Sequence, residues 1–242
     1  LDNDQLEVPD LLQAMAAEKS ASSTACPSPA AFARAFEKGD RTICFTISAN
    51  LSGTYNAAVM GRELTLEEYP DKQICVIDSK STAGAMVLLV RRAQALIEAN
   101  PNVDFEDLCA QLRMYQASLR TCFTLENFDN LIKNGRMRPI VGTLLRSLGI
   151  HIIADATAEG TIHVADKARG VGKTYRAITA LMKASKDCTD AEVVISHCEN
   201  LEGAMALKRQ ILADLPVKQV DLLSCRGLTS FYAMEKGLIV GY

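Results

Sequence analysis

Two consecutive segments of the chain repeat the order strand, polar loop, helix, and this order most constrains the fold. Residues 42–47 are rich in apolar and β-branched side chains, and the loop 48–54 follows them before a helix that begins near Tyr55. Residues 73–77 predict a second short strand, with the loop 78–82 and a long helix after it. Strands that alternate with helices in this way pair in parallel. The sequence therefore predicts an α/β fold.

The second half of the chain predicts a different order of strands and helices. Residues 151–166 predict two strands joined by a turn, and further strands at 192–196 and 218–223 alternate with helices. We therefore expect two α/β domains. The N-terminal domain, residues 1–145, would hold a Rossmann-like parallel sheet, and residues 146–242 would form a second, smaller α/β domain.

Composition argues against several classes of function. The 26 Lys and Arg against 29 Asp and Glu give a net charge of −3, and the chain lacks Trp, so neither phosphate attraction nor base stacking favours a nucleic-acid partner. The strongest apolar run, residues 86–90, is far shorter than the ~20 residues of a membrane span, and no secretory signal is visible. We expect no nucleic-acid partner and no stable membrane insertion.

The eight cysteines contain no CxxC pair, and several, including Cys44 and Cys75, lie within apolar segments. Such cysteines are typical of buried thiols in a reduced compartment. We therefore expect a cytoplasmic protein without a metal site or a cofactor. The chain begins at Leu1 rather than at a Met, and we expect a further N-terminal piece.

Three loops before expected helices carry the clearest binding signal. Residues 24–28, 48–54 and 78–82 place Ser and Thr hydroxyls where the first N–H groups of a helix are unpaired and slightly positive, and Gly53 lets a ligand approach the backbone. Lys80 is the only nearby cation in these loops, so they suit a carboxylate better than a triphosphate. Each hydroxyl alone is expected to cap its helix, whereas the three loops together favour an anion site.

Catalytic motifs are scarce. Residues 169–174 read Arg-Gly-Val-Gly-Lys-Thr, but Lys167 stands where a P-loop needs its first glycine. His197 and Cys198 are adjacent at a strand end, so their side chains point to opposite faces and form no pair of base and nucleophile. We expect no catalytic residues.

Five segments, in chain order, carry a family resemblance. They are Thr24-Ala-Cys-Pro-Ser-Pro29, Ile47-Ser-Ala-Asn-Leu-Ser-Gly-Thr-Tyr55, Val76-Ile-Asp-Ser79, Leu131-Ile-Lys-Asn-Gly-Arg136 and Lys167-Ala-Arg-Gly170. Over nearly the whole chain this set resembles the DegV family of bacterial fatty-acid-binding proteins. The resemblance implies a long-chain fatty acid held between the two domains, with its carboxylate on Ser/Thr hydroxyls and its tail in an apolar tunnel. In some relatives a separate kinase phosphorylates the bound carboxylate.

The motifs place the family's carboxylate-binding residues on this chain. The family threonine falls on Thr24 and the serine of Leu-Ser-Gly-Thr on Ser52, whereas Ala25 and Ala49 replace two further family serines. The resemblance assigns the carboxylate to Thr24, Ser48, Ser52 and Gly53, and it suggests Ser28, Arg169 and Tyr232 as neighbours of the head group.

The chain also departs from the family. The usual C-terminal His-x-Gly-Pro-Gly corresponds to residues 232–236, Tyr-Ala-Met-Glu-Lys, and the usual first strand ending in Asp-Ser has no counterpart. A phenol is uncharged near pH 7 and lacks the switchable proton of His. Arg169 would attract an incoming phosphate, yet we expect a fatty-acid binder that is a poor acyl donor to a fatty acid kinase. An acyl or phosphoryl transferase using the same pocket, and an interaction module without a ligand, are the alternatives.

Overall fold

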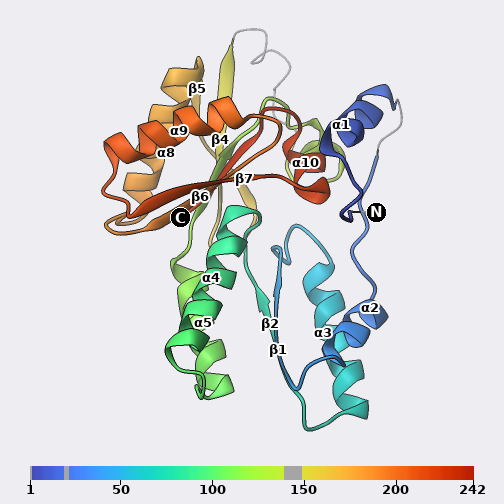
Figure 1. Ribbon diagram of the computed structural model, residues 1–242. Coiled ribbons are helices and arrows are strands. Elements are labelled where there is room, and N and C mark those ends of the chain that lie inside the picture. Colours follow the sequence, from blue (N-terminus) through green and yellow to red (C-terminus); the bar gives the residue numbers. More distant parts are fainter. Residues whose placement is uncertain (1, 19–21, 139–148) are drawn as a thin grey trace.

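The computed structural model describes residues 2–18, 22–138 and 149–242. Its described strands form two sheets. The first contains β1 and β2 in parallel, and the second has the strand order β5-β4-β3-β8-β6-β7. Figure 1 shows the small parallel sheet and its helices below the six-stranded sheet. The strands are β1 (Arg41–Thr46), β2 (Gln73–Asp78), β3 (Thr121–Thr124), β4 (Ile150–Ala156), β5 (Ile162–Arg169), β6 (Glu192–His197), β7 (Gln219–Ser224) and β8 (Leu238–Gly241).

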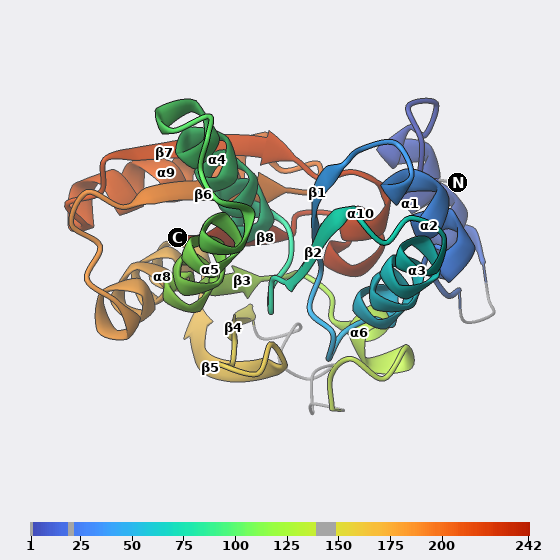
Figure 2. The same ribbon diagram turned by 90° about the horizontal axis from the view of Figure 1, so that it is seen from below.

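Four helices cover the parallel sheet: α2 (Pro29–Phe36), α3 (Thr54–Glu68), α4 (Gly84–Ala99) and α5 (Phe105–Ser118). Seen from below, α2 and α3 lie on one side of the strands and α4 and α5 on the other (Figure 2). Alternate strand residues explain this sandwich. Val76 packs with Phe36 of α2, whereas Cys75 and Ile77 pack with Leu108 of α5. The predicted parallel α/β unit is confirmed.

The six-stranded sheet is mixed. Strands β6 and β7 are parallel, and its other neighbouring pairs are antiparallel, including the predicted pair β4 and β5. Its remaining described helices are α1 (Val8–Ala17), α6 (Asp129–Lys133), α8 (Val171–Ser185), α9 (Leu201–Asp214) and α10 (Gly227–Ala233). Among the described helices, none is long and apolar enough to cross a membrane.

The two faces of the six-stranded sheet pack against different parts of the chain. One face packs on α8 and α9, with Val240 in the core beside Ile178 and Leu207. The next residue along β8, Ile239, points to the other face together with Phe123 of β3. That second face looks toward the parallel unit. The glycine at position 84 permits the contact between the two, since a Cβ there would lie 2.5 Å from the carbonyl oxygen of Val194.

The change from one sheet to the other differs from the predicted division of the chain. Strand β3 already pairs with β4 and β8, and α1 packs on α10, so both belong with the C-terminal elements. The second unit also has the larger sheet. Four fully buried residues in β3 show no alternation that would reveal their partners. The predicted junction of 145 and 146 lies outside the described residues, and the limits of the folding domains stay a prediction.

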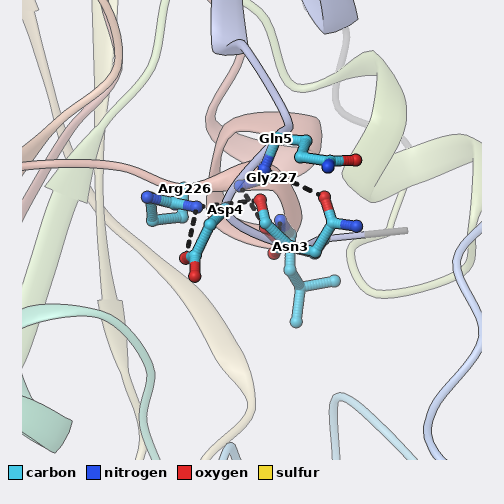
Figure 3. A network of polar contacts seen from close by, with 7 residues as sticks. Asn3, Asp4, Gln5, Arg226 and Gly227 are labelled. Carbon is cyan, nitrogen blue, oxygen red and sulfur yellow. Dashed lines mark hydrogen bonds and ion pairs between the residues drawn. The ribbon is translucent and has the colours of Figure 1, made fainter.

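The N-terminal segment is fastened to the start of α10. The Asp2 carboxylate accepts hydrogen bonds from the backbone N–H groups of Gly227 (3.1 Å) and Leu228 (2.8 Å). The Arg226 guanidinium donates to the carbonyl of Asn3 at 2.9 Å (Figure 3). A carboxylate at this position satisfies N–H groups that have no partner within the helix. Residues from opposite ends of the chain thereby hold α10 in place.

Candidate functional site

A pocket lies between the parallel unit and the six-stranded sheet. Small-molecule sites are often found between two such units of a fold. Its walls are mainly apolar and come from both units, because β3, β8 and α6 face the loops that follow β1 and β2. The apolar lining residues are Ile47, Leu51, Phe123, Leu125, Leu131, Ala156, Ile162, Leu228, Ala233 and Ile239.

Thr24 and Tyr232 meet at the wall of this cavity. The Thr24 hydroxyl lies 2.9 Å from the Tyr232 hydroxyl, and either oxygen can donate. Thr24 precedes α2, whereas Tyr232 lies on α10, where its ring packs edge-on against Phe231. The structure therefore joins two residues predicted separately, one from each half of the chain.

Ser52 lines the same cavity from the loop before α3. Its hydroxyl lies 2.8 Å from the Thr54 hydroxyl and accepts a hydrogen bond from the Thr54 N–H at 3.3 Å. A serine hydroxyl has one donor and two acceptor positions, so one position stays open to a ligand. The side chain is half-buried, which leaves it accessible from the cavity.

Ser48 is engaged in hydrogen bonds within the protein. Its side chain is fully buried, donates to the Gly160 carbonyl at 2.7 Å and accepts from the Asn50 N–H at 3.2 Å. It does not line the cavity. Because its only donor is committed to Gly160, Ser48 ties its loop to the turn between β4 and β5, and its contact with a head group stays a prediction.

Three further predicted residues also lie outside the main cavity. Gly53 is exposed at the start of α3, and Ser28 caps α2 by accepting from the Ala31 N–H at 3.2 Å. Arg169 is exposed at the end of β5 opposite to Ile162, which lines the cavity. At ~3.3 Å per strand residue the two residues are about 20 Å apart along β5, and the role of Arg169 beside a head group stays a prediction.

A second, more open cavity shares Thr24, Ser52 and Arg136 with the first. Gly53 and Thr54, at the start of α3, line it as well. The shared residues therefore form a wall that is reached from two sides. One side is the apolar cavity, and the other faces the N-terminus of α3.

Arg136 is the residue that the sequence assignment missed. It lines both cavities, its Nε donates to the Leu51 carbonyl at 2.9 Å, and its guanidinium carbon lies 5.8 Å from the centre of the Tyr232 ring. The motif that ends at Arg136 is visible in the sequence. The contact of Arg136 with Leu51, next to Ser52, is not, because the two segments lie far apart along the chain. The preceding Gly135 has a φ of +74°, and this left-handed turn directly before a cation was the available local signal.

Three titratable side chains lie near the C-terminal ends of β6 and β7. Burial raises the pKa of the Cys198 thiol and raises that of Cys225 to about 12, while burial lowers the pKa of His197. Thiols with raised pKa values are poor nucleophiles near neutral pH. Within the described parts of the chain, no group of three or more His, Cys, Asp or Glu side chains is arranged to hold a metal ion.

Comparison with known proteins places the chain in a family. The family model described as "Uncharacterised protein, DegV family" matches residues 1–237. A DegV domain-containing protein of Streptococcus pneumoniae (strain ATCC BAA-255 / R6) is 35% identical over 243 residues, which cover 100% of this chain and 85% of that protein.

Solved structures agree with this match. A DegV family protein from Eubacterium eligens loaded with heptadecanoic acid has a TM-score of 0.93 and 32% identity, covering 99% of this chain and 86% of that one. The Streptococcus pneumoniae Fatty Acid Kinase (Fak) B3 protein loaded with linoleic acid has a TM-score of 0.92 and 35% identity, covering 100% and 85%. The chain described here belongs to the DegV family.

Proposed function

We propose that this protein binds a long-chain fatty acid without acting on it chemically. The observation that carries the proposal is the apolar cavity whose polar wall contains Thr24, Ser52 and Tyr232. The hydroxyls would orient the carboxylate, and the tail would extend past Phe123 and Ile239. Two similar structures hold heptadecanoic acid and linoleic acid, which supports the same ligand class here.

The tail and the head group are expected to contribute different amounts of binding free energy. Burial of about 14 methylenes contributes a gross ~11 kcal/mol before ordering costs, at ~0.8 kcal/mol each. One hydrogen bond to a charged carboxylate adds only ~1.5–3 kcal/mol. The tail therefore sets most of the affinity, whereas the hydroxyl groups set the direction in which the acid lies.

A transferase that uses the same cavity is the alternative. It would need a base or an activated nucleophile beside Ser52, but the hydroxyl next to Ser52 is that of Thr54. We therefore favour a binding protein over an enzyme. All eight cysteines are free thiols, which fits a reducing compartment, and we propose the cytoplasm as its location.

A fatty acid kinase is the partner that we propose for this carrier. The second cavity would give such a partner access to Thr24 and Ser52 without passing the tail. Arg169 lies exposed at the end of β5, and the phosphate contact suggested by the resemblance stays a prediction. Tyr232 offers a phenol hydroxyl where the family usually has the imidazole of His, so we expect poor transfer to phosphate even when the lipid is bound well.

Native mass spectrometry of the purified protein tests the proposed function. We expect a co-purifying acyl chain, or uptake of added palmitate or oleate by delipidated protein in a 1:1 complex. Ser28→Ala is the matched control for Ser52→Ala, because it removes an exposed hydroxyl outside the main cavity. Protein that carries no acyl chain and takes up neither acid would contradict the proposal. Turnover of ATP by the isolated protein, lost in Ser52→Ala, would favour the transferase.

A further inference from the structure

A third pocket lies on the face of the six-stranded sheet that packs on α8 and α9. Its walls come from the starts of these two helices, which lie side by side, from the end of β3 and from the residues before β8 (Figure 1). Among the described lining residues it shares only Leu125 with the main cavity. We call it the α8–α9 pocket. Val171 and Thr174, from the segment 169–174 that opens α8, line it.

Tyr175 brings an unpartnered hydroxyl to this pocket. The residue is only 8% exposed, belongs to the core beneath α8 and lines the pocket. Within the described part of the chain its hydroxyl has no hydrogen-bond partner. Burial and then the charge of Glu202 raise the pKa of this phenol, so it keeps its proton near neutral pH. A buried hydroxyl with a proton to donate is stabilised by an acceptor inside the pocket.

The start of α8 is open to the same pocket. Gly170 is the N-cap residue, and no described side chain accepts from the first N–H groups of the helix. Val171 and Thr174 bring this first turn to the pocket wall. A Cβ built on Gly172 would have no atom of another described segment within 4 Å, so there is room beside the turn. Unpaired N–H groups with a partial positive charge suit a carboxylate.

The pocket wall also carries full charges of both signs. Glu126 follows β3, Glu202 lies in the first turn of α9 and Lys236 precedes β8, and all three are exposed and line the pocket. Within the described part of the chain none of them forms an ion pair. An anion would lie near two carboxylates, and a cation would lie near Lys236 and the positive end of α8. A ligand that carries both charges can pair with both kinds of group.

We propose that the α8–α9 pocket binds a small zwitterion of the α-amino acid class. The N–H groups at the start of α8, Lys236 and the Tyr175 hydroxyl would hold its carboxylate. Glu126 and Glu202 would hold its ammonium group. An α-amino acid carries these two groups on one carbon, which matches opposite charges around a single pocket. The inference does not depend on the proposed fatty-acid function, because the two pockets have different walls.

Thermal unfolding of the full chain with each standard L-amino acid, one at a time at about 10 mM, tests the proposal. A ligand that binds only the folded protein stabilises it, so at least one amino acid should raise the unfolding midpoint in a saturable way. Isothermal titration with that amino acid should give one ligand per chain. The matched acid without the amino group and the matched amine without the carboxylate should each bind at least about ten-fold more weakly.

Single substitutions place the ligand in the pocket. Glu202→Gln should weaken binding of this amino acid by about ten-fold. Glu199→Gln is the matched control, since it alters an exposed carboxylate before α9 that does not line the pocket, and it should leave the affinity within about two-fold. Tyr175→Phe should weaken binding by about five-fold, because one hydrogen bond to the ligand is lost. Its unfolding midpoint without ligand should stay unchanged.

Three results would overturn the proposal. If no amino acid raises the midpoint, the pocket has no ligand of this class. If the matched amine or the matched acid binds as well as the amino acid, the site does not require both charges. If Glu202→Gln has no effect, or no more than Glu199→Gln, the ligand binds elsewhere. Should Tyr175→Phe not fold, Ala206→Leu narrows the pocket from α9 and must weaken binding by more than about ten-fold, and an unchanged affinity would exclude this pocket.

Discussion

The hydroxyl oxygens of Thr24 and Tyr232 lie 2.9 Å apart across a separation of 208 residues in the sequence. This contact connects the loop before α2 to helix α10, and it lies in the wall of the main cavity. Because each hydroxyl can donate either to the other or to a ligand, the pair can reorient when a carboxylate arrives. The contact thereby links the two units to the expected head group.

The first prediction concerns this pair. Thr24→Ala should weaken fatty-acid binding by ~1–3 kcal/mol, because one hydrogen bond to a charged head group is lost. Tyr232→Phe, which keeps the ring under Arg136, should have a smaller effect. Isothermal titration with palmitate measures both. In the double variant the two effects should not add, since the hydroxyls are in contact. Strict additivity would mean that they act separately.

Substitution by Ala should lower protein stability at Ser48 but ligand affinity at Ser52. Ser48→Ala should lower the free energy of unfolding by ~1–3 kcal/mol, because the buried Gly160 carbonyl loses its donor. Ser52→Ala should instead weaken palmitate binding by ~1–3 kcal/mol and affect stability only through the start of α3. Urea unfolding and titration calorimetry on both variants separate the roles. A loss of affinity confined to Ser48→Ala would reverse our assignment.

Asp2 should stabilise α10 from outside the helix. Asp2→Ala should lower the free energy of unfolding by ~0.5–2 kcal/mol, the usual range for a lost helix cap, because the N–H groups of Gly227 and Leu228 lose their acceptor. Asp4→Ala is the matched control, since Asp4 contacts Arg226 only at 3.5 Å and is exposed. Urea unfolding should show little change for Asp4→Ala. Equal stability of the two variants would exclude a capping role for Asp2.

Burial of Cys225 predicts a loss of stability in alkali. Its pKa is raised from 9.0 to about 12, first by burial and then by the charge of a Cys198 thiolate. The unfolded thiol ionises near its ordinary value while the folded one stays protonated, so the contribution is complete below pH 9 and is lost as the pH rises toward 12. Urea unfolding at several pH values measures this slope. Cys225→Ala should flatten the slope, and an unchanged slope would refute the assignment.

Tyr232 should limit phosphorylation of the bound acid. With a fatty acid kinase, ATP and lipid-loaded protein, we expect little acyl phosphate. Tyr232→His should raise the yield, because imidazole can exchange a proton near neutral pH. Tyr232→Phe is the control that removes the phenol without adding imidazole, and it should not raise the yield. Robust acyl-phosphate formation by the unaltered protein would contradict this prediction.

Local patterns predicted much of the fold. The two strand-loop-helix units, the antiparallel pair β4 and β5 and the cap at Ser28 depend on residues a few positions apart. The short central strand β8 was not predicted, because its four residues have no polar alternation and lie between β3 and β6, far away in the sequence. Its position depends on its partners rather than on its own composition.

The candidate site likewise has features that follow from local sequence and features that depend on distant segments. The sequence by itself determined which loops carry hydroxyls, and it pointed to Thr24, Ser52 and Tyr232. Only the tertiary structure decided that Ser48 is committed to Gly160 and that Arg136 reaches the cavity. The physical reason is that a loop's residue types follow from local chain geometry, whereas the direction of a hydroxyl or a guanidinium depends on the carbonyl groups that distant segments bring within hydrogen-bond distance.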